Sequence, residues 1–339
     1  MPLPYAYGEP EYSGIIRHCP EDFIVDEISD IKPDGEGEHV LLQIKKRNSN
    51  TDWLAKQLAQ LASVVAKDVS YAGLKDRQAV TTQWFSVRLA GKEEPDWSEL
   101  NSDEFEVLQV HRHNRKLRRG ALKGNRFKLL IRELSSDQER LESRLEQIKQ
   151  QGVPNYFGEQ RFGIEGANLE KAQAMFAGKR IKSRHQRSMY LSAARSQLFN
   201  HVLSQRVRQQ NWNQAIAGDV MLLAGSNSFF SINETDDELC QRVDSFDIHP
   251  SAILWGRGQA ETQGPAAAME NELTEQFPDF CTGLEKAGLK AARRALRVVP
   301  EKMEWSYHPE QKQLALSFEL PAGAYATVVL REVINCRLG

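Results

Sequence analysis

Apolar residues in the first 150 positions recur with two spacings, one typical of strands and one typical of helices. Short apolar or alternating runs predict β-strands at residues 40–44, 69–72, 83–89 and 127–131. Apolar residues three or four positions apart predict two amphipathic helices. The first carries Leu54, Leu58, Leu61 and Val65 and is capped by Asn50 or Thr51, and the second carries Leu141, Leu145 and Ile148 and ends at Gly152 and Pro154.

The pattern changes after Pro154. A loop rich in glycine and aromatic residues, NYFGEQRFG, precedes sequence that is largely helical in its pattern to about residue 303. The predicted elements are helices around 191–202 and 285–298, short strands at 220–223 and 229–232, and a cleanly alternating strand at 313–320.

The last of these strands resembles the first half of the chain more than the middle. We therefore predict one β-rich domain made of both ends of the chain, with a mostly helical domain inserted at 151–303. Such insertions are tolerated at exposed loops, and chain termini lie close together in many domains.

Composition is that of a folded soluble protein, with 339 residues, 40% hydrophobic and 27% charged. This length suggests about two domains. No apolar run reaches the ~18 residues that a membrane span needs, and the N-terminal sequence has no secretory h-region. The four cysteines lie far apart without a Cys-x-x-Cys pair. We therefore expect reduced thiols in a cytoplasmic protein and no cysteine-based zinc site.

Charge is nearly balanced overall but segregated along the chain. Lys and Arg number 44 against 46 Asp and Glu, for a formal net charge of -2, which argues against a histone-like coat. Yet residues 111–128 hold eight Lys or Arg and no acid, and residues 171–210 hold nine and no acid. Blocks of one sign favour a nucleic-acid partner, because neutralising phosphates releases counterions. The alternative is that each block is a solvated surface.

The segment 73–77, Gly-Leu-Lys-Asp-Arg, is the most specific local signal. It places the Asp76 carboxylate between two cations in a loop that joins two predicted strands. Adjacent positive charge favours the ionised form of a carboxylate, which a nucleophile or base requires. The alternative is a turn aspartate that hydrogen-bonds its own backbone, and spacing alone leaves both open.

Two further segments carry residues suited to a nucleic-acid base. In Lys-Gly-Asn-Arg-Phe at 123–127, the amide of Asn125 can hydrogen-bond a base edge and Phe127 can stack on it. A core position explains Phe127 equally well. In the NYFGEQRFG loop, Phe157 and Phe162 fit a plug between domains better than a stacking surface.

Several other chemistries lack their sequence motifs. The chain has no G-x-x-x-x-G-K-[ST] phosphate loop, no strand followed by G-x-G-x-x-G, and no G-x-S-x-G nucleophile elbow. Its histidines do not pair at i, i+4, so no helical metal site is indicated. The missing glycine-rich cofactor turn also disfavours an RNA methyltransferase.

Seven segments, taken in order, resemble the tRNA pseudouridine synthase D family. They are CPEDFIVDE, PDGEGEHV, AGLKDRQAVTTQW, RKLRRGALKGNRF, GVPNYFGEQRFG, LSAARSQLFN and LPAGAYATVVLRE, and they span nearly the whole chain. The resemblance implies an α+β fold. Residues 1–150 plus 304–339 would form a pseudouridine-synthase catalytic domain with a mixed, largely antiparallel sheet flanked by helices, and 151–303 a family-specific RNA-binding insertion. It also implies isomerisation of uridine to pseudouridine in tRNA, at position 13 for bacterial members, with no cofactor and no metal.

The resemblance also implies roles for individual residues. Asp76 matches the catalytic aspartate of the family's G-x-K-D motif. Phe23, in PEDF, matches an aromatic beside the target nucleotide, and Asn125, in KGN, matches a polar substrate contact. Tyr325 matches an aromatic position that is often Phe in relatives. Arg17 matches a basic position that can be Lys and is expected to pair with the aspartate, with a different geometry because arginine can bind a carboxylate through two nitrogens.

The reaction requires the N1–C1′ bond to break, the uracil to turn, and C5 to bond to C1′. A carboxylate can attack C1′ or remove the 2′ proton to give a glycal, and the sequence does not choose between these routes. The uridine must first leave its stack, at a cost of a few kcal/mol that phosphate contacts would offset. The candidate RNA-backbone contacts are Lys75, Arg77, Arg115, Lys116, Arg118, Arg119, Lys123, Arg161, Lys182, Arg184 and Arg187. The implied partner is tRNA, with no membrane and no protein partner.

Two other classes of protein remain as alternatives. A non-catalytic RNA-binding protein would show the same charged blocks and aromatic residues, but it would not need an acid between two cations. A hydrolase that removes a base would usually need a second carboxylate ~5–9.5 Å from the first, and it would release free uracil.

Overall fold

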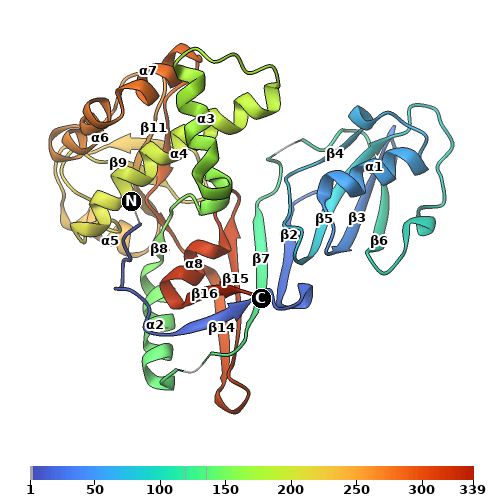
Figure 1. Cartoon of the computed structure of the whole chain (residues 1–339), viewed down its shortest axis with the longest axis horizontal. Coiled ribbons are helices and arrows are strands. Elements are labelled where there is room, and N and C mark those ends of the chain that lie inside the picture. Colours follow the sequence, from blue (N-terminus) through green and yellow to red (C-terminus); the bar gives the residue numbers. More distant parts are fainter. Residues whose placement is uncertain (1–2, 119, 135) are drawn as a thin grey trace. The chain divides into compact units, whose positions relative to one another are not determined.

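The computed structural model describes residues 3–118, 120–134 and 136–339, which fold into two units (Figure 1). The sheet unit comprises Glu11–Glu142, Pro300–Gly323 and Ile334–Gly339. The helical unit comprises the described part of Met1–Pro10, together with Ser143–Val299 and Ala324–Val333. These bounds differ from the expected division because the segments 3–10 and 324–333 pack with the middle of the chain.

In the described part of the chain, an eight-stranded sheet organises the sheet unit. Its strands are β2 (Phe23–Ile28), β3 (His39–Arg47), β4 (Val69–Tyr71), β5 (Val80–Arg88), β6 (Phe105–His113), β7 (Gly124–Ile131), β14 (Glu301–His308) and β15 (Gln313–Pro321). The order is β14-β15-β7-β2-β5-β3-β6, with β4 also paired to β5, and every pairing is antiparallel except β2 with β5. The predicted α+β class with a largely antiparallel sheet is confirmed.

Shorter elements complete the sheet unit. They are β1 (Ser13–Ile16), which pairs in parallel with β16 (Asn335–Leu338), helix α1 (Thr51–Leu61), and the 3-10 turns η1 (Pro20–Asp22), η2 (Ala66–Asp68), η3 (Trp97–Leu100) and η6 (Pro309–Gln311).

Helix α1 covers one face of strands β3 and β5, as its apolar stripe predicts (Figure 1). Leu54 and Leu58 are fully buried there with Ile44 and Phe85, and burial of each such side chain stabilises the fold by about 1.5–3 kcal/mol. The helix ends at Leu61, earlier than the stripe predicted, so Val65 lies beyond it and is 56% exposed. The placement of Val65 on the buried stripe was wrong.

The helical unit surrounds a second, antiparallel sheet with the order β10-β9-β11-β12. Its helices are α3 (Ala167–Phe176), α4 (Arg184–Arg208), α5 (Asp237–Asp244), α6 (Gly264–Gln276), α7 (Pro278–Lys286) and α8 (Ala326–Val333), and α2 (Gln138–Gln151) leads into it from the sheet unit. Its strands are β8 (Val153–Pro154), β9 (Val220–Leu223), β10 (Phe229–Ser231), β11 (Ile248–Leu254), β12 (Ala292–Ala295) and β13 (Arg297–Val298), with the turns η4 (Glu159–Phe162) and η5 (Ile164–Gly166). Within the described residues, every helix is too short or too polar to cross a lipid bilayer.

The predicted helix at 285–298 was wrong. Helix α7 ends at Lys286, and Gly288 follows with a φ of +84°, a left-handed conformation that commonly terminates helices. The residues beyond it form β12, which pairs with β11, and β13, which pairs with β8. Pairing with distant strands therefore overrides the helical propensity of an Ala-, Arg- and Lys-rich segment.

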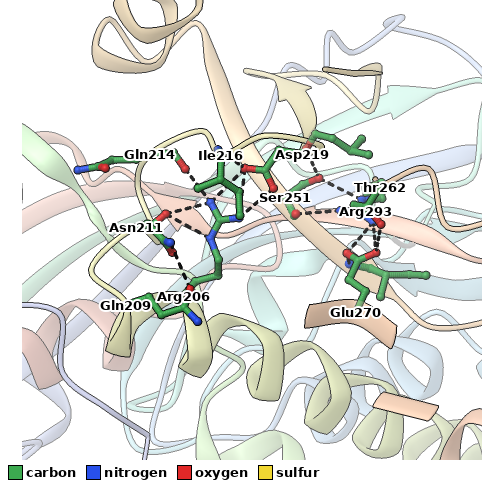
Figure 2. Close-up of polar contacts among 12 residues, drawn as sticks. Arg206, Gln209, Asn211, Gln214, Ile216, Asp219, Ser251, Thr262, Glu270 and Arg293 are labelled. Atoms are coloured by element: carbon green, nitrogen blue, oxygen red, sulfur yellow. Dashed lines mark hydrogen bonds and ion pairs between the residues drawn. The ribbon is translucent and has the colours of Figure 1, made fainter. Parts of the chain in front are cut away.

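Two buried ion pairs lie in the interior of the helical unit (Figure 2). Arg206 on α4 donates to Asp219, just before β9, at 2.8 and 3.1 Å, and it also donates to the carbonyl oxygens of Asn211 and Gln214.

The second buried ion pair joins Arg293 on β12 to Glu270 on α6, with 2.8 Å between Nη1 and Oε1. The two pairs link α4 to the segment before β9 and α6 to β12, and their hydrogen bonds offset the cost of burying the charges.

Candidate active site

Asp76 lies in the loop between β4 and β5, and the sheet topology gives it its partner. Strand β5 pairs in parallel with β2 at Val80–Thr82. Because parallel strands begin at the same end of a sheet, the segment before β2 and the loop before β5 meet there. Arg17 stands before β2, and its Nη2 lies 2.6 Å from Oδ2 of Asp76. The structure thus brings together the two residues expected to pair.

The backbone conformation of Arg17 and its contacts with Phe23 and Asp76 fix the position of its guanidinium. Its φ of +59° lies in the left-handed region, which non-glycine residues rarely adopt and which is often found at functional sites. Its guanidinium carbon lies 4.1 Å from the centroid of the Phe23 ring. The Arg17 side chain is only 10% exposed, whereas that of Asp76 is 36% exposed. The carboxylate therefore remains accessible while its cationic partner is covered.

The carboxylate opens into a pocket of about 500 Å³ in the sheet unit. The residues that line it are Arg17, Asn48, Asp76, Arg77 and Gln78. This environment differs from the alternative of a turn aspartate surrounded by solvent, because the carboxylate pairs with a cation that is itself buried against an aromatic ring.

A buried lysine holds the backbone of Asp76. Lys46 Nζ donates to the Asp76 carbonyl oxygen at 2.9 Å and to the Ser49 carbonyl oxygen at 2.6 Å. Lys46 is completely buried, and burial lowers its pKa from 10.5 to about 8. Lys46 was not among the expected site residues. Its sequence position carries a signal, since it continues the two-residue spacing of the apolar residues at 40, 42 and 44 on β3.

Two hydrogen bonds and one ion pair connect residues 73–75, in the loop that carries Asp76, to the sheet and to α1. Thr51 Oγ1 accepts from the Lys75 backbone N–H at 3.1 Å, and Gln83 Nε2 donates to the Gly73 carbonyl oxygen at 3.2 Å. Lys75 Nζ pairs with Glu27 at 3.2 Å, and burial raises the pKa of Glu27 although Lys75 opposes that shift. The Lys75 side chain is 6% exposed and so presents little surface to an RNA phosphate.

The candidate base contacts on β2 and β7 lie largely in the core. Phe23 is 1% and Phe127 6% exposed, their ring centroids lie 6.3 Å apart, and Phe127 also packs on Phe318 at 5.5 Å. Asn125 stands opposite Glu27 in the β2–β7 register. Its Oδ1 is buried without a hydrogen-bond partner in the described chain, which leaves an acceptor for a ligand.

Tyr325 and Arg161 belong to the helical unit and contact each other there. Arg161 Nη2 donates to the Tyr325 hydroxyl oxygen at 2.6 Å, and its Nη1 donates to Ser192 at 2.9 Å. Phe157 is buried within this unit, with the Arg294 guanidinium carbon 4.1 Å from its ring centroid. The contacts of Arg161 thus fix the orientation of Tyr325.

The other candidate RNA contacts fall into two groups of exposed cations. Arg77, Arg115, Lys116 and Arg118 are exposed on the sheet unit, and Lys182, Arg184 and Arg187 are exposed at or just before the start of α4. Lys123 is exposed but forms an ion pair with Asp30. Arg119 lies outside the described residues.

The geometry of the described chain offers no metal centre, since no three His, Cys, Asp or Glu side chains gather as a metal ion requires. Comparison with known proteins decides the family. The sequence model of tRNA pseudouridine synthase D matches residues 3–181 and 167–333. The chain belongs to this family. The resemblance to tRNA pseudouridine synthase D and the enzyme class that it implied, an isomerase, are confirmed.

Individual tRNA pseudouridine synthase D relatives cover nearly the full length. Those of Methylococcus capsulatus and Aeromonas hydrophila are 51% and 50% identical, and each match spans 98% of this chain and 94% of the relative. A crystal structure described as a putative tRNA pseudouridine synthase D from Methanosarcina mazei superposes with a TM-score of 0.71 at 23% identity, over 98% of this chain and 95% of that one. At this low identity, the similarity supports the shared fold.

Proposed function

We propose that this member of the tRNA pseudouridine synthase D family isomerises uridine at position 13 of tRNA, with Asp76 as the catalytic residue. One observation carries the proposal. The Asp76 carboxylate is accessible from a pocket and is paired with Arg17, which is itself covered. Curated relatives at about half identity carry the corresponding enzyme name.

The chemistry needs an ionised oxygen in a fixed position. Asp76 either attacks C1′ or removes the 2′ proton to give a glycal, and in both routes uracil leaves with the N1–C1′ electron pair. After the uracil turns, its C5 bonds to C1′. In the first route this breaks the bond between Asp76 and C1′, and in the second C2′ regains its proton. C5 then loses its proton and N1 gains one, so the product is an isomer of the substrate. Arg17 sets the direction of the carboxylate through a charge-assisted hydrogen bond.

Three further residues are proposed to serve the flipped-out nucleotide. Phe23 supports the guanidinium of Arg17, and Asn125 offers its free carbonyl oxygen to an N–H of the base. For Tyr325, hydrogen-bonded to Arg161 within the helical unit, the family resemblance implies an aromatic contact with the substrate. In this proposal the sheet unit carries the chemistry, and the exposed cations at the start of α4 help to hold tRNA.

Tritium release from tRNA that carries 5-tritiated uridine, followed by nucleoside analysis, tests the proposal. We expect pseudouridine from wild-type tRNA and none when position 13 is cytidine. Asp76→Asn should lower turnover by at least about 10²–10⁴-fold, the usual contribution of a positioned acid or base, and retain tRNA binding. Asp103→Asn, at an exposed position of the sheet unit, is the matched control and should keep full activity.

The same assay separates the two alternatives. Wild-type protein that binds tRNA but releases no tritium would indicate a non-catalytic RNA-binding protein. Free uracil and an abasic nucleotide would indicate a hydrolase. Either outcome would overturn the proposed isomerisation.

A further inference from the structure

The sheet unit carries a second concavity, of about 940 Å³, that shares no lining residue with the Asp76 pocket. Helix α1 and turn η2 supply part of its wall, strand β4 supplies its base, and residues 115–118 supply the rest. The cations that line it are Lys56, Lys67, Arg115, Lys116 and Arg118. We name this feature the basic groove.

We propose that the basic groove binds the ribose-phosphate backbone of the tRNA substrate. The inference rests on the proposed function for the identity of the polyanion. It adds Lys56 and Lys67, which stand outside both acid-free blocks of the sequence, to the residues that contact RNA.

The cations of the basic groove are not neutralised by the protein. Within the described chain, none of the five forms an ion pair. Some exposed cations elsewhere on the same unit do so, including Lys45 with Glu106 at 3.2 Å and Arg88 with Glu38 at 2.9 Å. The one acid in the groove lining, Asp52, accepts a hydrogen bond from the Tyr71 hydroxyl. Unpaired like charges in one concavity repel each other, and a bound polyanion would relieve that repulsion.

Hydrogen bonds within the protein hold the wall of the basic groove in place before any ligand binds. Leu117 is 7% exposed, its N–H donates to Ser86 at 3.0 Å, and its carbonyl oxygen accepts from Ser70 at 2.9 Å. The two hydrogen bonds of Leu117 hold residues 115–118 in place, and the side chains of this segment line the basic groove. Lys116 Nζ also donates to the Lys67 carbonyl oxygen at 2.5 Å, which joins two walls. Such preorganisation reduces the entropy lost on binding.

The number and spread of the cations in the basic groove indicate the kind of anion that it would bind. The five cations come from three separate segments of the chain. One phosphate cannot neutralise them all, whereas a chain of phosphates can. The basic groove therefore favours RNA over a small phosphorylated metabolite.

The test compares two double variants of the full-length protein that remove the same charge. Lys56→Ala with Lys67→Ala removes two cations of the basic groove, and Lys45→Ala with Arg88→Ala removes two exposed, ion-paired cations. Affinity for tRNA is measured over a range of salt concentrations. Each lost phosphate contact should reduce the slope of log K against log salt by about 0.7–0.9. We expect the groove variant to lose roughly 10- to 50-fold in affinity at ~0.1 M salt, with KM for tRNA rising by a similar factor.

The outcomes distinguish this inference from the proposed function. An active enzyme whose groove variant keeps the wild-type affinity and salt slope would overturn the basic groove as an RNA site and leave the isomerisation intact. An equal loss of affinity in the control variant would also overturn it, because the effect would then follow net charge alone. Failure of the wild-type protein to isomerise uridine would instead overturn the proposed function.

Discussion

Arg17 and Asp76 stand 59 positions apart in the chain, yet their side chains meet at 2.6 Å. The parallel pairing of β2 with β5 produces this meeting, because it places the segments before both strands at one end of the sheet. The left-handed backbone of Arg17 and its contact with Phe23 fix the cation independently of the carboxylate. The pair is therefore part of the architecture and is not a chance surface contact.

Replacing Arg17 should lower turnover without weakening tRNA binding. Arg17→Met removes the charge-assisted bond to Asp76, and loss of one such positioned donor typically costs about 10²–10³-fold in kcat. Arg17→Lys keeps the charge but loses the planar guanidinium that stacks on Phe23, so we expect a smaller loss. Single-turnover rates at saturating tRNA measure both effects. Arg140→Met, at an exposed ion pair of the same unit, is the control, and a wild-type rate for Arg17→Met would contradict the assigned role.

Lys46 should act as a positioning residue for Asp76. Lys46→Met leaves the carbonyl oxygens of Asp76 and Ser49 without their donor, so the loop loses a constraint at the reacting residue. Because a displacement of about 1 Å can cost 10²-fold in rate, we expect kcat to fall by about 10- to 100-fold while the Kd for tRNA stays the same.

The neighbouring residue provides a matched control for Lys46. Lys45→Met changes an exposed lysine on the same strand whose partner is Glu106, and it should leave kcat unchanged. A purely structural role for Lys46 would lower the unfolding midpoint and the fraction of active protein but not the kcat of the folded enzyme. Active-site titration separates these cases, and an unchanged kcat per active site would disprove the positioning role.

Acid should destabilise the helical unit through His249. Burial, and secondarily Arg297, lower the His249 pKa from 6.5 to about 4, and Arg297 donates to its Nδ1 at 3.1 and 3.2 Å. Between pH 6.5 and 4 the unfolded chain binds the proton more tightly than the folded one. This contribution to stability is therefore complete above pH 6.5 and is lost as the pH falls. We expect a loss of about 2 kcal/mol by pH 5.

Urea unfolding at pH 7 and pH 5 measures the His249 effect. His249→Gln keeps an acceptor for Arg297 but cannot be protonated, so its unfolding free energy should change less between the two pH values than that of the wild type. An equal change in the two proteins would assign the acid sensitivity to other groups.

The local elements follow closely from periodicity where a segment has one buried face. Strands β3 and β15 lie where the spacing of apolar residues places them, and helix α1 begins where predicted but ends before Val65. The same reasoning failed at 285–298, because strand partners from other parts of the chain outweigh helical propensity there. Charge alone does not show which cations are exposed, and the fold places the ammonium of the candidate phosphate contact Lys75 against Glu27.

The amino-acid sequence alone determined the family, the fold class and the aspartate-containing loop, because ordered motifs and periodic patterns are properties of neighbouring residues. Only the tertiary structure decided how Arg17 reaches Asp76, that Lys46 holds the Asp76 carbonyl oxygen, and that separate cations gather in the basic groove. These relationships depend on which strands pair and in which direction. The pairing of strands is set by the burial of whole sheet faces. It therefore depends on residues that are distant in sequence and cannot be read from one short segment.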